Sequence, residues 1–310
     1  MEKEDKKILD LINKKETFDK ISSQIEILDK AFRALNTDYS YHVENTFGKD
    51  HKIFEMKKDI EFRLFSSKFH LQLLLQQHFK IEKRIESIYN EDRESIIRSM
   101  YPSNPIFDYC EKEITAIFDS IIFHLASVYD YLSAIINFIC NNKNETISKW
   151  SQLNNACRQK GVYLNKNISK IIIDEHNQFV NNLYKYRSRL IHSTSDVHPI
   201  SFDLILSSGK TNVKFFATNS LIKNFSELRE KAKTHKITVS YSVNWIIDST
   251  LKSIMKILFG LKSEMEKNST FWTRKDQGLT FMHRDPKTGI GEFVSKKMWE
   301  EVEKEVKNHN

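Results

Sequence analysis

Apolar residues recur at helical spacing along most of the chain, and strict two-residue alternation is confined to one short segment. In residues 3–35 the apolar positions fall three and four residues apart with charged residues between them, which predicts an amphipathic helix that could be broken near residues 14–16. Residues 36–50 are rich in Asn, Asp and Ser and predict a loop. The predicted helices occupy residues 3–35, 51–100, 106–141, 146–160, 168–192, 221–235, 241–267 and 296–307.

The alternating segment is 202–217, which carries a turn signal at 208–210 and predicts a β-hairpin. The whole chain of 310 residues contains only 7 Gly and 4 Pro. Because sheets and long loops need turn residues, this scarcity favours long helices. We therefore predict an all-α helical bundle with a small hairpin insertion and with extensions at both ends.

Residues 106–141 form the most apolar segment of the chain. A membrane span needs about 20 apolar residues with few or no charges. Asp119, His124 and Asp130 interrupt this run, and we find no second candidate span. The segment is therefore expected to be the central helix of a bundle, with no membrane partner.

Small and polar residues form a line along this same helix. Ser120, His124, Ser127 and Tyr131 fall at i, i+4, i+7 and i+11, so they share one stripe. Close helix packing with satisfied hydroxyls is one explanation of the stripe. The other is that the stripe, together with nearby Asp130, lines a polar pocket.

The formal net charge of +7 suits a polyanionic partner such as nucleic acid, although a Lys- and Asn-rich composition produces such a charge by itself. Cys110, Cys140 and Cys157 are odd in number and widely spaced, which predicts neither a disulfide framework nor a zinc site. The charged first residues do not resemble a signal peptide. We therefore expect a cytoplasmic protein.

Common catalytic motifs are absent from the sequence. His192 and His198 could ligate a metal, but no third ligand stands at a recognisable spacing from them. The sequence contains neither Gly-x-Ser-x-Gly nor His-Glu-x-x-His. Neither a metal nor an organic cofactor is expected.

The stretch from Tyr186 to His192 places two arginines and a histidine beside large apolar residues. In a helix of about 100° per residue, Arg187 falls within the apolar stripe that continues to Leu190 and Ile191. A guanidinium in that position needs a carboxylate, a subunit interface or a phosphate as its partner. Ser188 and Arg189 fall on the outer side.

This stretch resembles the signature of the HEPN family of helical proteins, many of which are ribonucleases. The signature is an Arg, four to six further residues and a His, often with a polar residue directly after the Arg. Arg187 and His192 match the four-residue form, and Ser188 stands where Asn, Asp or His is more usual. As in the family, the motif ends an amphipathic helix that follows a long apolar one.

The resemblance implies a domain organisation. A HEPN-like bundle would cover residues 51–267, with the hairpin as an insertion. Residues 1–50 would form an N-terminal helix and loop, and residues 268–310 a C-terminal extension.

The resemblance also implies a composite site in a homodimer. Arg187 and His192 point about 140° apart on a regular helix. They meet at one phosphate only if the helix unwinds near Ile191 or if two subunits share the site, and the family implies the second.

The implied chemistry is metal-independent cleavage of RNA. Histidine titrates near neutral pH, so His192 would serve as general acid or base, and Arg187 would stabilise the transition-state charge. Ser188, Arg189, Ser127, Asp130 and His124 are auxiliary candidates. The family further suggests a toxin or antiphage effector, with an antitoxin or regulator protein as a possible partner.

Two other hypotheses remain open. The bundle could bind nucleic acid or a protein without cleaving it, which the serine after Arg187 and the helix geometry favour. Alternatively, Arg187 could pair with an acidic residue such as Asp130 across the core while His192 caps a helix end. In that case Arg187→Ala would unfold the protein.

Overall fold

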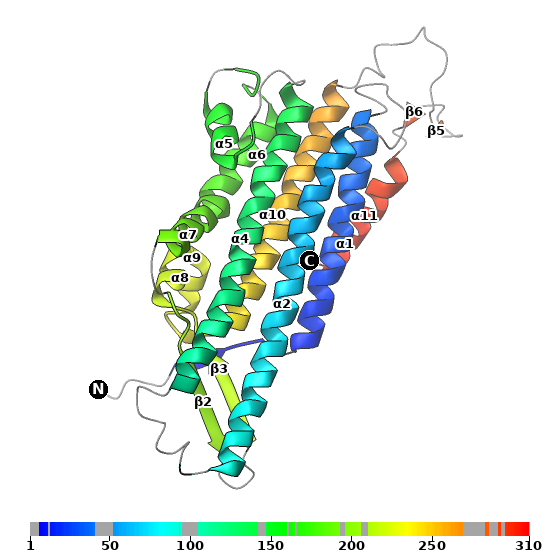
Figure 1. Cartoon of the computed structure of the whole chain (residues 1–310). Coiled ribbons are helices and arrows are strands. Elements are labelled where there is room, and N and C mark those ends of the chain that lie inside the picture. Colours follow the sequence, from blue (N-terminus) through cyan, green and yellow to red (C-terminus); the bar gives the residue numbers. More distant parts are fainter. Residues whose placement is uncertain are drawn as a thin grey trace. The chain divides into compact units, whose positions relative to one another are not determined.

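A computed structural model gives the structure of the protein (Figure 1). It describes residues 6–40, 52–94, 105–141, 147–268 and 283–309, apart from gaps at 12, 93, 160, 165, 193–195, 206–209, 285–290 and 293–294.

Most of the described chain is helical, so the predicted all-α helical bundle is confirmed. The helices are α1 (Lys14–Asp38), α2 (Lys52–Glu91), α4 (Pro105–Asn141), α5 (Trp150–Arg158), α6 (Asn167–Glu175), α7 (Asn181–His192), α8 (Asn219–Asn224), α9 (Ser226–Lys231), α10 (Val239–Asn268) and α11 (Lys296–His309). A π-helical turn, His176–Val180, joins α6 to α7.

The strands are short and form three separate pairs. The predicted hairpin is confirmed: β2 (Ile200–Ile205) pairs antiparallel with β3 (Lys210–Phe215), and its turn lies outside the described residues. β5 (His283–Arg284) pairs antiparallel with β6 (Gly291–Glu292). β1 (Lys7–Leu9) pairs in parallel with β4 (His235–Ile237), which the sequence did not predict.

The prediction that one helix begins near residue 3 is wrong. The backbone of β1 is used for pairing with β4, and the Asp10 carboxylate then accepts hydrogen bonds from Lys214 and, at 2.8 Å, from the Thr238 hydroxyl. The Asn13 side chain accepts a hydrogen bond from the backbone N–H of Glu16 at 3.1 Å. Asn13 thus satisfies one of the free N–H groups at the start of α1, as an N-cap residue does.

The prediction of one helix over residues 221–235 is also wrong in part. The helix is divided at Phe225, whose extended backbone precedes α9 and whose side chain is buried. Burial of this ring therefore overrides the helical propensity of its neighbours.

The chain divides into two compact units, and α1, α2, α4 and α10 each contribute a segment to both. Unit 1 consists of residues 1–19, 66–126 and 179–248. Its core contains aromatic rings from different helices, with Phe225 packed edge-on against Trp245 at 5.3 Å between centroids. The hairpin and α7 belong to this unit.

Unit 2 consists of residues 20–65, 127–178 and 249–310. Its core includes Trp150, whose ring lies 5.2 Å from that of Tyr129. On α10, a Cβ added at Gly260 would lie 2.6 Å from the Cδ1 of Ile171, so the glycine allows α6 to pack closely against α10.

By length and composition, α4 could cross a membrane, since its most apolar window has a mean hydropathy of 1.4. In that window 67% is buried inside the protein, as in the central helix of a bundle.

Candidate functional site on helix α7

Two tyrosines fix the orientation of α7. The Tyr186 hydroxyl donates a hydrogen bond to the Asp196 carboxylate at 3.0 Å, and the Tyr186 ring packs edge-on against Phe118. Tyr184 donates to the backbone carbonyl of Ala126 on α4 at 3.0 Å. These contacts hold the segment that carries the Arg–His motif in one rotation about its axis.

Asp196, which accepts the hydrogen bond from Tyr186, is not among the residues predicted from the sequence. The same carboxylate oxygen also accepts hydrogen bonds from Thr218, at 2.9 Å, and from Ser220. Burial, followed by the negative charge of Asp196, raises the pKa of Tyr186 far above its ordinary range, so its hydroxyl stays a donor. Burial also raises the pKa of Asp119 to about 6, with a further contribution from Asp196.

Arg187 and His192 occupy very different environments. Arg187 is half-buried, and its Nε atom is enclosed by protein. His192 is exposed at the end of α7 and makes no hydrogen bond or ring contact with any residue that the structure describes. Because α7 stays α-helical through His192, the helix does not unwind near Ile191. Within one chain the two side chains therefore leave the helix about 140° apart.

The apolar stripe of α7 ends earlier than predicted. Val180 and Leu183 are buried, and Leu190 is half-buried. The prediction that Ile191 faces the core is wrong, because its side chain is 57% exposed. The buried contacts of α7 end at Tyr186, so the last turn extends beyond the core of unit 1.

The outer side of α7 carries polar and cationic residues. Ser188 and Arg189 are exposed, as their helical positions predict, and Lys185 is exposed as well. Lys185, Ser188, Arg189 and His192 fall at i, i+3, i+4 and i+7, so they share one face. Lys185 was not predicted as a site residue, although its helical spacing from Ser188 and Arg189 places it on their face.

The polar stripe of α4 is used in several ways. The Ser120 hydroxyl donates to the carbonyl of Ala116 at 3.0 Å, within its own helix. His124 lies beside His70 of α2, with 5.1 Å between the ring centroids. In unit 2, Tyr131 accepts a hydrogen bond from Arg63 of α2 at 3.4 Å. These two α2–α4 contacts each lie within one unit.

The other two auxiliary candidates, Ser127 and Asp130, belong to unit 2. Ser127 is half-buried. One oxygen of Asp130 accepts a hydrogen bond from the backbone N–H of Trp150 at 3.0 Å. The side chain of Lys149, the residue before α5, makes no capping hydrogen bond. The Asp130 carboxylate on α4 therefore accepts from one of the free backbone N–H groups at the start of α5.

The helix predicted over 168–192 is interrupted by its π-helical turn, which lies just before α7. Such turns occur frequently at functional sites. Here His176 accepts a hydrogen bond from the indole of Trp150 at 3.1 Å, and Asn177 accepts one from Arg158 at 2.8 Å. Side chains of α5 therefore support the turn.

His198, the second candidate metal ligand, is buried, and its Nδ1 lies 3.2 Å from the carbonyl oxygen of Phe216. Burial lowers the pKa of this imidazole to about 4. Among the described residues, no three His, Cys, Asp or Glu side chains are grouped as metal ligands.

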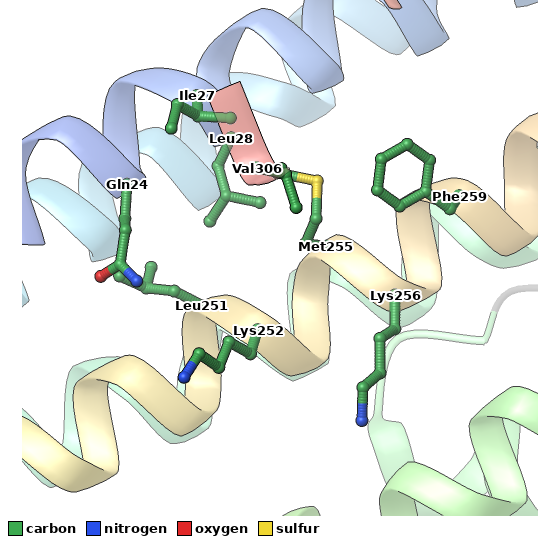
Figure 2. Close-up of a pocket in the computed structure, with 9 residues that line it drawn as sticks. All are labelled: Gln24, Ile27, Leu28, Leu251, Lys252, Met255, Lys256, Phe259 and Val306. Carbon is green, nitrogen blue, oxygen red and sulfur yellow. The ribbon is translucent and has the colours of Figure 1, made fainter. Parts of the chain in front are cut away.

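A cavity of about 220 Å³ lies within unit 2, where α1, α10 and α11 meet (Figure 2). Apart from Gln24, Lys252 and Lys256, its lining is apolar: Ile27, Leu28, Leu251, Met255, Phe259 and Val306. None of the predicted site residues lines it.

No family model, no curated protein and no solved structure matches the chain.

Proposed function

We propose that the chain is a metal-independent endoribonuclease of the HEPN type. The observation that carries the proposal is the arrangement of the motif on α7. Arg187 is half-buried, whereas His192 is exposed at the end of the same anchored helix. A permanent cation held at the edge of the core and a titratable imidazole open to solvent suit charge stabilisation and proton transfer respectively.

The proposed reaction uses the RNA as its own nucleophile. The ribose 2′-oxygen attacks the adjacent phosphorus while a histidine takes its proton, and the bond from phosphorus to the 5′-oxygen breaks. The leaving oxygen receives a proton, and the products are a 2′,3′-cyclic phosphate and a free 5′-hydroxyl. His192 serves as general base or acid, and Arg187 stabilises the additional negative charge on the phosphorane-like transition state.

The proposed site is shared between two copies of the chain. Because Arg187 and His192 of one chain point about 140° apart, a second copy is needed to bring the imidazole to the phosphate that the guanidinium holds. A symmetric dimer supplies two such combinations. A nuclease of this kind would serve as a toxin or antiphage effector, and an antitoxin or regulator protein would control it.

The test is cleavage of a fluorescent RNA by the wild-type chain and by His192→Ala, with light scattering to measure the mass of both. We expect His192→Ala to abolish cleavage while the dimer persists, and we expect added chelator to have no effect. A matched control is His235→Ala, since Arg229 and His235 also have motif spacing but lie on α9 and β4. Full activity in His192→Ala would overturn the proposal.

The alternative is a HEPN-like module that binds RNA without cleaving it. Two features favour this alternative. Ser188 stands where the family usually has Asn, Asp or His, and the regular helix through His192 keeps the Arg187 and His192 side chains of one chain apart. RNA binding without cleavage at high protein concentration would support it.

A further inference from the structure

The segment that contains α7 has no negatively charged side chain. Between His176 and Ser195 the sequence contains no Asp and no Glu, although the whole chain has 41 of them. Within this segment, Lys185, Arg189 and His192 share the exposed face of α7. With a rise of about 1.5 Å per residue, they follow one another at about 6 and 4.5 Å along the helix axis.

Within the described residues, no ion pair neutralises the charges on this face. Some exposed lysines elsewhere have carboxylate partners three or four residues away in their own helices, as in Lys112–Asp108 and Lys83–Glu86. Lys185 and Arg189 make no ion pair with any residue in the described part of the chain. The face therefore presents an uncompensated positive potential to solvent.

The neighbouring helix α8 carries a further exposed cation. The Asn224 side chain donates a hydrogen bond to the backbone carbonyl of Asn182, which ties the end of α8 to the start of α7. Lys223, the residue before Asn224, is exposed and likewise has no ion-pair partner among the described residues. We call Lys185 and Arg189 the α7 cationic face.

We infer that the α7 cationic face binds the sugar–phosphate backbone of a single RNA strand beside the bond that is cleaved. The inference rests on the proposed function for the identity of the cleaved polymer. Cations spaced along one helix can follow the phosphates of one strand, and such contacts bind without reading sequence. A single strand also suits the reaction, because the 2′-oxygen must line up with the leaving oxygen, which the regular geometry of a duplex prevents.

The experiment separates binding from cleavage by using His192→Ala as the background. The affinity for a fluorescein-labelled oligouridylate is measured by anisotropy over a range of salt concentrations. The test variant adds Lys185→Gln and Arg189→Gln. The control adds Lys58→Gln and Lys80→Gln, which remove two exposed α2 lysines and therefore the same total charge.

We expect the test variant to weaken binding by about tenfold or more and to reduce the slope of log affinity against log salt by about 1.4, or 0.7 for each lost contact with a single strand. The control is expected to keep the slope of the background. An equal loss in both variants, or an unchanged slope in the test variant, would overturn the inference. So would tighter binding of an RNA duplex than of the single strand.

The outcomes also distinguish the inference from the proposed function. If the wild-type chain binds RNA through the α7 cationic face but never cleaves it, the inference stands and the nuclease proposal falls. If the wild-type chain cleaves RNA while the test variant binds as tightly as its background, the nuclease proposal stands and the inference falls.

Discussion

Arg187 and His192 lie five residues apart on a helix that stays regular to its last residue, with the guanidinium at the edge of the core and the imidazole in solvent. Their side chains leave the helix about 140° apart, so one copy of the chain presents the two groups to different surroundings. A site that uses both at one phosphate has to combine an arginine from one copy with a histidine from another.

This relationship predicts complementation between two inactive variants. Arg187→Ala and His192→Ala should each be inactive alone, but a mixture that exchanges subunits should recover activity. Random exchange in a symmetric dimer makes about half of the dimers mixed, with one intact site each, so about a quarter of wild-type activity is expected. Cleavage is measured before and after equal amounts are incubated together.

The double variant Arg187→Ala, His192→Ala mixed with wild-type chain is the control, because every mixed dimer then lacks both intact combinations. Its activity should not exceed that of the wild-type dimers remaining. A mixture of the two single variants that stays inactive despite proven exchange would contradict a shared site.

Tyr186→Phe should destabilise the fold by about 1.5–3 kcal/mol, because the Asp196 carboxylate loses a buried donor. The matched control is Tyr184→Phe, which removes a hydrogen bond to the uncharged carbonyl of Ala126 and should cost about 1 kcal/mol. Urea unfolding of both variants at pH 7 gives the comparison. A smaller loss for Tyr186→Phe than for Tyr184→Phe would argue against Asp196 as the anchor of α7.

Stability should depend on pH through His198. Its folded pKa of about 4 lies below the ordinary value of about 6.5, so its contribution is complete above pH 6.5 and is lost as the pH falls towards 4. Between pH 7 and pH 5 this loss amounts to about 2 kcal/mol. In His198→Asn, whose amide can still donate to the Phe216 carbonyl, the free energy of unfolding should fall less over this range.

Asp119 changes the free energy of unfolding with pH in the opposite direction to His198. Its folded pKa, raised to about 6, gives a contribution that is present in acid and is lost as the pH rises through 6. Since both proteins contain Asp119, its effect cancels in the difference between wild type and His198→Asn. An identical pH dependence in the two proteins would contradict the role given to His198.

Asp38 should hold α11 in place. Its carboxylate accepts hydrogen bonds from the Trp299 indole, at 2.8 Å, and from Ser295, and all three residues are buried. Asp38→Ala would leave these donors without their acceptor at a cost of about 1–3 kcal/mol each. Hydrogen exchange in α11 should become faster, whereas Lys30→Ala, which removes a partly exposed ion pair with Glu305 of α11, should leave it unchanged.

Helical periodicity predicted the long elements well because their buried residues repeat over many turns. The heart of α4 and the apolar positions of α10 are examples, and both helices were predicted within two residues of their observed ends. Periodicity failed where a distant partner decides the structure. Residues 7–9 have helical spacing, but β4 provides them with backbone hydrogen bonds that no local pattern reveals.

The candidate site shows the same division. The outward position of Ser188 and Arg189 follows from helical phase alone. The exposure of Ile191 does not, because it depends on where the neighbouring core ends. Nor could Asp196 be recognised, since a single carboxylate in a connecting segment has no periodic signal and gains its role only from the hydroxyls that converge on it.

The pairing of β1 with β4 also sets an order of events during synthesis. Asp10, just after β1, bonds to Thr238, which lies 228 residues further along the chain. β1 therefore cannot pair until β4, which lies more than 220 residues further along the chain, has been made. Until β4 has been made, the backbone groups of β1 remain open to other strands, so unit 1 cannot close before residue 237 has been added.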